Sequence, residues 1–407
     1  MKKSNKQLKE RGDKVFIGTY ARYPAAMVKG SGCRLTDADG KEYVDFMAGI
    51  AVCGLGHAHP KITEAICHQA GELVHVSNLY YTEPQIELAE LITDNSFGEK
   101  LFLCNSGAEA NEAAIKLARI YSGEGRYKII SLSGSFHGRT LATVAATGQP
   151  KFHKGFEPLP EGFLHAPFGD LQALEQLIDG STCAILCEPL QGEGGVRPLA
   201  KEYLQGIKAL CEKHNLLLIF DEIQTGMGRT GTLFAYEQLD IEPDILTMAK
   251  ALGSGLPIGA MLTSVKIAES FVPGTHASTF GGNPVASAAA VATLKIMLAD
   301  GFLAGVRQKG EYFQAELGKL AERFPAMISS VRGMGLLVGA VLTEKGVIHG
   351  TEIVNKMFDR GFLMNFAGNV VLRFVPPLIV TKEEIDLLVT TLAEVLAEFC
   401  YADTRLA

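Results

Sequence analysis

The chain has 407 residues, of which 47% are hydrophobic and 20% charged, and its formal net charge is −7. The length is typical of roughly two or three domains, and the composition is that of a globular protein. Acidic side chains are in excess and no basic run extends beyond the N-terminal tail, which argues against nucleic acid or an anionic membrane surface as a partner.

The first part of the chain, residues 1–49, contains short strand-like pieces such as Glu42–Asp45, and we expect it to pack with a small domain. It has no apolar core of a secretory signal, and no stretch reaches the roughly 18–20 apolar residues of a membrane helix. The eight cysteines form no Cys-x-x-Cys pair. We therefore expect reduced thiols, a cytoplasmic location and no metal site.

From about residue 85, short apolar runs alternate with helical patterns, which is typical of a mostly parallel sheet flanked by helices. This α/β pattern predicts a large domain over residues 50–285. The predicted strands are Leu101–Cys104, Lys128–Leu132, Cys183–Cys187, Leu216–Phe220, Ile245–Met248 and Ile258–Leu262.

After about residue 285 the pattern changes, and residues 286–407 are predicted to form a smaller α+β domain. A long alanine-rich helix precedes two strand candidates, Leu336–Leu342 and Val370–Val375, and helical periodicity returns from Lys382 to Phe399.

Five of the six sheet strands run directly into polar or glycine-rich residues. In open α/β sheets, ligands bind outside the carboxyl ends of the strands. We therefore expect the chemistry to converge on one edge of the sheet.

The first such segment is Ser106-Gly107-Ala108, which opens a helix. Free backbone N–H groups and the positive end of the helix dipole make this a phosphate site, although Ser106 is equally suited to an ordinary N-cap. The second contains Phe136, whose ring can stack on a flat cofactor, and Arg139, which can bind a carboxylate in a bidentate manner. A buried phenylalanine beside a solvated arginine is the alternative for that loop.

Carboxylates follow the next two strands. The loop with Glu188 and Glu193 could bind metal, act in acid–base chemistry or pair with arginine, and its sequence does not choose. Asp221 ends a wholly apolar strand, where burial disfavours its ionised form unless a cation lies beside it. A protonated pyridine nitrogen is such a cation; a helix N-cap or a magnesium ligand is the alternative.

Lys250 lies between an apolar strand and an Ala/Gly segment. Burial lowers the pKa of a lysine and makes it a nucleophile that can form a Schiff base, although a lysine can also reach solvent from such a place. A phosphate cradle, a stacking ring, an acidic partner for a ring nitrogen and a buried lysine together indicate pyridoxal 5'-phosphate.

At these residues the sequence resembles the class III aminotransferases of fold type I over essentially its whole length. The matching motifs are Asn105-Ser106-Gly107-Ala108-Glu109-Ala110, Phe136-His137-Gly138-Arg139-Thr140, Glu188-Pro189-x-Gln191-Gly192-Glu193-Gly194-Gly195, Asp221-Glu222-x-Gln224-x-Gly226-x-Gly228-Arg229-Thr230-Gly231, Ala249-Lys250-x-Leu252-Gly253 and Ser278-Thr279-Phe280-Gly281-Gly282-Asn283-Pro284. Three further stretches favour the acetylornithine branch of the family: Gly49–Val52 with Leu55-Gly56-His57, Arg332–Leu337 and Leu372–Leu378.

The resemblance implies a role for each site residue. Lys250 and Asp221 are expected to be catalytic, with Lys250 bonded to the cofactor and Asp221 keeping its ring nitrogen protonated. The other cofactor-binding residues implied are Ser106, Gly107, Ala108, Phe136, His137, Gln224 (near the ring hydroxyl) and Thr279 (at the cofactor of a neighbouring subunit). The substrate-binding residues implied are Arg139, Tyr20 and Ser278 for the distant carboxylate, Arg373 for the α-carboxylate of glutamate and 2-oxoglutarate, and Glu193 as a cover for Arg373.

The same resemblance implies an aminotransferase that moves the terminal amino group of N2-acetylornithine to 2-oxoglutarate, and a homodimer with shared active sites. Other ω-amino acids remain open as substrates: ornithine, succinylornithine and 4-aminobutyrate. An aminomutase or racemase on the same scaffold, or a non-catalytic cofactor-binding protein, would be a different class.

Overall fold

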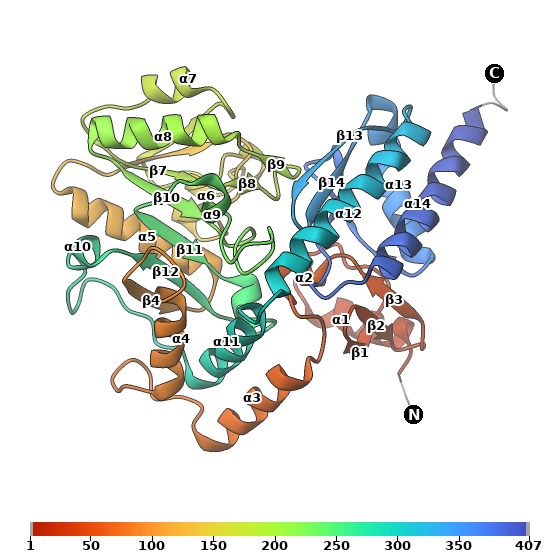
Figure 1. Cartoon of the computed structure of the whole chain (residues 1–407), viewed down its shortest axis with the longest axis horizontal. Helices are drawn as coiled ribbons and strands as arrows, with labels where there is room; N and C mark the ends of the chain where they lie inside the picture. Colours follow the sequence, from red (N-terminus) through yellow and green to blue (C-terminus); the bar gives the residue numbers. More distant parts are fainter. Residues whose placement is uncertain (1–2, 404–407) are drawn as a thin grey trace.

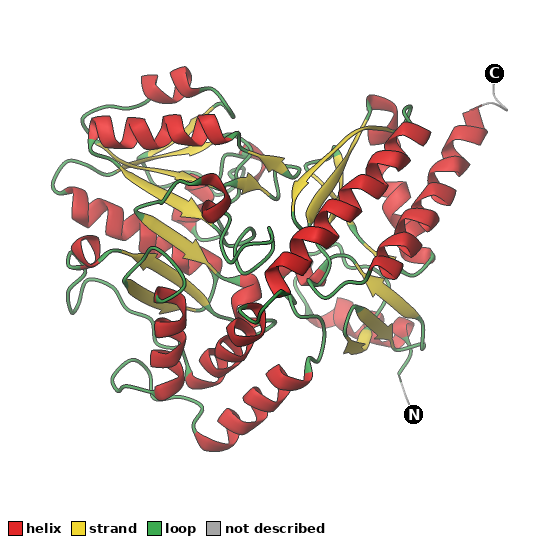
Figure 2. Cartoon of the chain, in the orientation of Figure 1, coloured by secondary structure: helices red, strands yellow, loops and turns green. Residues whose placement is uncertain are grey.

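The computed structural model describes residues 3–403. A large domain built on a central sheet lies on one side of the molecule, and a smaller domain lies on the other together with the N-terminal segment (Figure 1). Both ends of the chain lie on the side of the smaller domain. The predicted architecture, a mostly parallel sheet flanked by helices and a smaller α+β domain, is confirmed (Figure 2).

The central sheet has seven strands. In spatial order they are β4 (Lys100–Cys104), β12 (Gly259–Thr263), β11 (Ile245–Met248), β10 (Leu217–Asp221), β7 (Thr182–Cys187), β5 (Lys128–Leu132) and β6 (Phe163–Ala166). The six predicted strands are confirmed, each to within one residue at either end. The edge strand β6 was not predicted. β12 is antiparallel to both its neighbours, whereas the other pairings are parallel.

The inner strands are apolar throughout because both faces of the sheet are covered. In β10, Leu217 and Ile219 pack in the cluster that contains α5, whereas Leu218 and Phe220 pack in the cluster that contains α8. Each such side chain contributes roughly 1.5–3 kcal/mol when it is fully buried. This two-sided burial fixes where β10 ends, and therefore where Asp221 lies.

The helices of the large domain are α3 (Pro60–Glu72), α4 (Glu83–Thr93), α5 (Gly107–Ser122), α6 (Leu141–Ala146), α7 (Leu171–Gln176), α8 (Lys201–His214), α9 (Tyr236–Leu239), α10 (Val265–Ala268) and α11 (Pro284–Met297). Short 3-10 helices η1 (Pro150–Phe152) and η2 (Lys250–Gly253) and a two-stranded ribbon, β8 (Leu190–Gln191) with β9 (Arg197–Pro198), complete it. α11 is the predicted alanine-rich helix; it was expected in the smaller domain, whereas it packs against α3 and α4 of the large domain.

The smaller domain is an antiparallel sheet of order β13-β14-β17-β16, backed by three helices. Its elements are α12 (Phe302–Arg323), β13 (Ile328–Met334), β14 (Leu337–Leu342), α13 (Glu344–Asp359), β16 (Asn365–Ala367), β17 (Val371–Phe374) and α14 (Lys382–Asp403). β14, β17 and α14 correspond to predicted elements, whereas β13 and β16 were not predicted.

The N-terminal segment contains α1 (Asn5–Val15), the strands β1 (Met27–Ser31), β2 (Arg34–Asp37) and β3 (Glu42–Asp45), and the short turn α2 (Ala48–Ala51). β3 pairs in parallel with β15 (Phe362–Leu363), so this segment shares a sheet with the C-terminal part of the chain.

All eight cysteines are unpaired. Within residues 3–403 no cluster of His, Cys, Asp and Glu side chains is arranged to hold a metal ion. In the same residues no single helix could cross a membrane by length and composition; α11 and α12 pass that test only jointly, and they are bent by 73°.

The junction between α12 and the β13–β14 turn gives a test of this packing. A Cβ on Gly310 would lie 2.3 Å from the carbonyl oxygen of Gly335, whereas a Cβ on Gly318 of the same helix meets nothing within 4 Å. We expect Gly310→Ala to lower the free energy of unfolding by about 2–3 kcal/mol, because backbone atoms cannot move aside. The matched control Gly318→Ala should raise it by about 0.5–1 kcal/mol. Urea unfolding measures both, and equal effects would contradict the packing described.

Candidate active site

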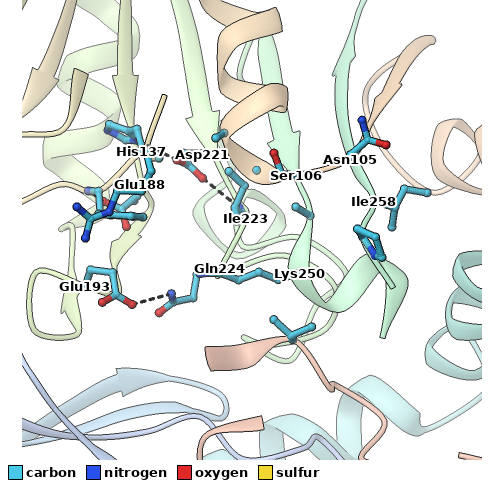
Figure 3. A pocket seen from close by; sticks show the side chains of 18 of the residues that line it. Asn105, Ser106, His137, Glu188, Glu193, Asp221, Ile223, Gln224, Lys250 and Ile258 are labelled. Carbon is cyan, nitrogen blue, oxygen red and sulfur yellow. Dashed lines mark hydrogen bonds and ion pairs between the residues drawn. The ribbon is translucent and has the colours of Figure 1, made fainter. Parts of the chain in front are cut away.

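A cavity of about 430 Å³ lies at the carboxyl ends of the parallel strands (Figure 3). Its walls come from the segments that follow β4, β5, β7, β10 and β11, as expected for a ligand site of an open α/β sheet. Because β12 runs in the opposite direction, it contributes from its beginning, through Leu256, Pro257 and Ile258.

The N-terminus of α5 forms one wall. Ser106 is the N-cap, and its Oγ accepts the Glu109 N–H at 3.2 Å. The first N–H groups of a helix have no acceptor within the helix, so those of Gly107 and Ala108 are available to an anion at the cavity wall. A Cβ on Gly107 would lie 2.7 Å from Cδ1 of Ile223, so only glycine fits between the helix and this side chain. Ser106 can therefore be the N-cap of α5 and at the same time part of a phosphate site.

Asp221 ends β10 and lines the cavity, with only 4% of its surface exposed. Its Oδ2 lies 2.7 Å from Nδ1 of His137, and Oδ1 accepts the Ile223 N–H at 3.1 Å (Figure 3). Oδ2 also accepts Nδ2 of Asn111 at 2.8 Å. A carboxylate offers about four acceptor positions. Three are used by the protein, and the fourth, on Oδ1, is left for a donor in the cavity.

Lys250 follows β11 by two residues and also lines the cavity. Its φ of 44° lies in the left-handed region, which is uncommon for a residue with a side chain. Burial lowers the pKa of the Lys250 ammonium, against the opposing charge of Glu193. A larger fraction of the amine is therefore neutral and nucleophilic than in an exposed lysine.

Arg373, from β17 of the smaller domain, is fully buried. Its Nη1 donates to Oε1 of Glu193 at 2.6 Å and to Oε1 of Gln224 at 3.2 Å, and its Nε donates to Asn365 at 3.1 Å. Burial alone would raise the pKa of Glu193, but the charges of Arg373 and Lys250 hold it below the ordinary value. The structure thus brings the predicted Glu193–Arg373 pair into direct contact. Nη2 of Arg373 is buried without a partner, which marks an open donor for an incoming acceptor.

Gln224 lies between these two residues. Besides accepting from Arg373, its Nε2 donates to Glu193 at 3.4 Å (Figure 3). Its contacts in this structure are therefore with the ion pair.

Glu188 is a second buried carboxyl group of the cavity. It accepts the N–H of Phe136 at 3.1 Å and that of Gly192 at 3.3 Å, and so joins the loop after β5 to the loop that carries Glu193. Burial raises the pKa of Glu188 well above its ordinary value, and the nearby Asp221 adds to this.

Two aromatic rings and a guanidinium lie together beside the cavity. The guanidinium carbon of Arg139 is 4.1 Å from the ring centroid of Phe152 and 5.5 Å from that of Phe136, and the two rings meet edge to face. Arg139 is exposed and lines the cavity, so its charge is accessible to an anionic ligand.

Four predicted site residues do not line this cavity within one chain: Arg373, which lies behind Glu193 and Gln224, and Ser278, Thr279 and Tyr20. The hydroxyl of Ser278 accepts a hydrogen bond from Nδ2 of Asn105 at 3.1 Å. Ser278 therefore contacts Asn105, which lines the cavity beside α5. Thr279 is exposed, and its carbonyl accepts from Ser77. Tyr20 is 72% exposed and lines a different cavity, beside α1.

Four residues in or behind the site were not singled out from the sequence: Val52, Asn111, Ile223 and Thr247. Asn111 carried a detectable signal, because it is a polar residue on the buried face of α5 between Ala110 and Ala114. Ile223 and Thr247 carried none, since apolar and β-branched residues are expected near strand ends.

Val52 reaches the cavity through a left-handed turn. Four successive residues, Ala48–Ala51, have φ between 47° and 66°. Left-handed backbone costs about 1–2 kcal/mol per non-glycine residue, so the turn needs support. Asp45 provides it: Oδ1 accepts the N–H groups of Met47 and Ala48, and Oδ2 pairs with Nε2 of His57 at 2.7 Å.

These residues fit pyridoxal phosphate. A helix N-terminus faces the space, Phe136 and Ile223 line it, a buried carboxylate keeps one acceptor position free, and a buried lysine opens onto it. The donor set matches a phosphorylated, protonated heterocycle with an aldehyde.

Comparison with known proteins agrees with this fit. Residues 18–396 match the family model described as aminotransferase class-III. An acetylornithine aminotransferase of Caldanaerobacter subterraneus subsp. tengcongensis is 51% identical over 389 residues, which cover 95% of this chain and 98% of the relative. A succinylornithine transaminase of Citrobacter koseri is 48% identical over 381 residues, which cover 93% and 94%. The crystal structure of an ornithine aminotransferase from Toxoplasma gondii has a TM-score of 0.92 at 32% identity, covering 97% of this chain and 96% of that one.

The Asp45–His57 pair predicts a pH dependence of stability. The hydrogen bond between His57 and Asp45 raises the pKa of His57 to about 9, from an ordinary value of about 6.5. The stabilisation is therefore fully present below about pH 6.5 and is lost as the pH rises through about 9. We expect the free energy of unfolding to fall by about 1 kcal/mol over this range, because the pair is partly exposed. His57→Gln should remove this slope and the exposed His68→Gln should keep it; a slope unchanged by His57→Gln would contradict the assignment.

Proposed function

The chain belongs to the class III aminotransferases, and from this premise we propose that it moves the terminal amino group of N2-acetylornithine to 2-oxoglutarate. The products are N-acetylglutamate 5-semialdehyde and glutamate. Membership of the family makes the chain a transaminase that depends on pyridoxal phosphate. The acetylornithine assignment is supported by the relative with that name at 51% identity over nearly the whole chain.

The observation that carries the proposal is the contact between Glu193 and Arg373. One site has to accept a substrate that presents an apolar stem and then one that presents an α-carboxylate. With the 2.6 Å contact closed, the charge of Arg373 is neutralised and the stem of acetylornithine can pass. With the contact open, the guanidinium can bind a carboxylate with two parallel hydrogen bonds.

Each remaining residue has a proposed part in holding the cofactor. The N–H groups of Gly107 and Ala108, with Ser106, would hold the phosphate, and Phe136 would stack on the ring. Oδ1 of Asp221 would accept the ring N–H, and Lys250 would bond to the aldehyde carbon. We place His137 as the partner of Asp221 and Gln224 beside the ring hydroxyl and the ion pair. Pyridoxal phosphate supplies an electron sink for the pair left when the substrate C–H bond breaks.

The side chain of Lys250 then acts as the base. Its neutral Nζ would take the proton from the carbon that bears the substrate nitrogen and would later return a proton. A positioned base of this kind contributes about 10²–10⁴-fold. Burial suits Lys250 to this part because it lowers the pKa of the ammonium.

We propose that Arg139 binds the carboxylate of acetylornithine far from the reacting amine. The guanidinium is accessible at the cavity and is held against Phe152 and Phe136. Tyr20 and Ser278 are proposed to help; both lie near the surface, and a second subunit would have to enclose Tyr20 beside this site.

We propose a homodimer in which Thr279 reaches the cofactor of the partner subunit. The surface around Thr279 is apolar: Leu79, Tyr80, Tyr81 and Phe280 are 61–94% exposed. The segments that carry these side chains are fixed to each other by Asn78, whose Nδ2 donates to the carbonyls of Ser278 and Gly281. An ordered apolar surface of this kind is typical of a protein–protein interface.

Succinylornithine is the second candidate substrate, because a relative with that activity in its name is 48% identical. Both compounds carry a neutral amide where ornithine carries an ammonium. Burying that charge without a partner would cost several kcal/mol, which disfavours ornithine in an apolar pocket. 4-Aminobutyrate also carries a carboxylate away from its amine, but one methylene closer than in N2-acetylornithine, so it would reach less far towards Arg139. The Glu193–Arg373 pair argues against an aminomutase, which needs no keto acid.

A cytoplasmic location and the lack of nucleic-acid and membrane partners stay predictions from the sequence.

The absorbance spectrum of the purified protein tests the function directly. We expect a visible band that borohydride reduction fixes to Lys250, because the amine and the cofactor aldehyde condense. N-acetylornithine added without keto acid should abolish the band, and 2-oxoglutarate should restore it. A band that persists with N-acetylornithine but disappears with succinylornithine or 4-aminobutyrate would replace the substrate assignment. No band after addition of pyridoxal phosphate would contradict the part proposed for Lys250.

The proposed opening and closing of the Glu193–Arg373 contact is tested by measuring the two half-reactions separately. Glu193→Ala leaves Arg373 without its carboxylate, so the positive charge faces the stem of the amine substrate. We expect the rate constant over KM for N-acetylornithine to fall by about 10–100-fold, since an uncompensated buried charge costs a few kcal/mol. The glutamate half-reaction should change by less than about threefold. Equal losses in both would overturn the switch.

A further inference from the structure

Behind Asp221 lies a chain of buried polar side chains that no step of the proposed reaction uses. Thr247 of β11 donates its hydroxyl to Oδ1 of Asn111 at 2.7 Å. Nδ2 of Asn111 donates to Oδ2 of Asp221 and to the carbonyl oxygen of His137, both at 2.8 Å. Thr247 and Asn111 are completely buried.

These contacts fix the orientation of the Asn111 amide. Both hydrogens of its NH₂ group are donated, one to a carboxylate and one to a carbonyl. Turned by 180°, its oxygen would face two acceptors instead. In the observed orientation that oxygen is turned towards β11, where the Thr247 hydroxyl is its donor.

The orientation of Asn111 in turn determines which oxygen of Asp221 is available. Oδ2 receives Asn111 and faces His137, whereas Oδ1 receives only the Ile223 N–H. The Asn111 contact therefore supports the direction of the Asp221 carboxylate, which is only 4% exposed.

The register of the sheet explains why Thr247 can do this. Thr247 and Asp221 are paired residues on the parallel strands β11 and β10. Asn111 lies four residues into α5, whose N-terminus forms the proposed phosphate cradle. The chain of contacts thus joins the two ends of the cofactor site through the interior of the protein.

We propose that Thr247 and Asn111 are positioning residues for the ring nitrogen of the cofactor: they hold the carboxylate of Asp221 turned so that Oδ1 accepts the ring N–H. This rests on the proposed function, in which Asp221 pairs with that nitrogen. Neither residue touches the reacting atoms, and both act through Asp221. Their loss should therefore weaken recognition of the nitrogen specifically and leave the phosphate and aldehyde contacts in place.

The test compares binding of pyridoxal phosphate with binding of its 1-deaza analogue, in which a C–H group replaces the ring nitrogen. Equilibrium dialysis of the apo-enzyme, prepared from the purified holoenzyme, gives both dissociation constants. The readout is the ratio of the analogue's constant to that of pyridoxal phosphate, which isolates the contribution of the nitrogen and involves no turnover.

Thr247→Val removes the hydroxyl at nearly constant volume, and we expect the ratio to fall by about threefold to tenfold, as for directly coupled groups. Thr247→Ser should restore it to within about twofold of the native ratio. Thr263→Val is the matched control, since Thr263 of the adjacent β12 is also buried but donates to the carbonyl of Asp244, away from the cavity. It should leave the ratio unchanged. If Thr247→Val does not fold, Asn111→Ala carries the same prediction with a larger fall.

Two results would overturn the proposal, and they are distinguishable. If Thr247→Val lowers the melting temperature as much as Thr263→Val does and leaves the ratio unchanged, Thr247 is an ordinary buried hydroxyl. That result leaves the proposed function intact. If the native enzyme binds pyridoxal phosphate and the analogue equally, Asp221 does not pair with the ring nitrogen, and the premise fails with the inference.

Discussion

The site depends on the compensation of charges that are buried at one edge of the sheet. Asp221, Glu188, Glu193, Lys250 and Arg373 all lie around or beside one cavity of about 430 Å³. An unpaired charge in such a place costs several kcal/mol, so each needs donors, acceptors or an opposite charge. The protein supplies these for Asp221 and Glu193, and it leaves two positions open: one acceptor position on Asp221 and one donor on Arg373. Those are the positions where a cofactor and a substrate can complete the arrangement.

The ion pair also joins the two domains, because Glu193 comes from the large domain and Arg373 from β17 of the smaller one. Arg229 makes a second connection: its Nη1 donates to the carbonyls of Leu336 and Pro376. Arg332 of β13 makes a third, since its Nη2 donates to the carbonyl of Gly195, in the loop that carries Glu193, at 2.7 Å. Several contacts that stay closed thus surround the Glu193–Arg373 contact, which is proposed to open. This arrangement suits a switch in which the side chain of Glu193 moves and the two domains keep their relative positions.

Much of this arrangement could be predicted from the sequence, for identifiable reasons. The strands are apolar runs ended by polar residues, so their ends and the positions of Asp221 and Lys250 followed directly. The direction of β12 did not, because an apolar run carries no information on strand direction. Edge strand β6 contains His165 and is only four residues long, which removed the apolar signal. Thr247 was hidden within a strand, where threonine is ordinary. The left-handed turn at Ala48–Ala51 was hidden because only one of its four residues is glycine. The parts proposed for Tyr20 and Thr279 require a second subunit, which the order of residues in one chain does not describe.

Gln224 explains how the Glu193–Arg373 contact, which is proposed to open, could do so without leaving the guanidinium without an acceptor. When Glu193 leaves, Arg373 still donates to Oε1 of Gln224 at 3.2 Å and to Asn365 at 3.1 Å, so the guanidinium is never without acceptors. The cost of opening is then the loss of the hydrogen bonds that Glu193 accepts from Arg373 and Gln224, and a substrate carboxylate can replace the first. The backbone leaves room for this partner: a Cβ on Gly192 would lie only 1.9 Å from Oε1 of Gln224. Glycine at this position therefore allows the amide to lie beside the loop that carries Glu193, and the neutral acceptor and the movable carboxylate can share one arginine.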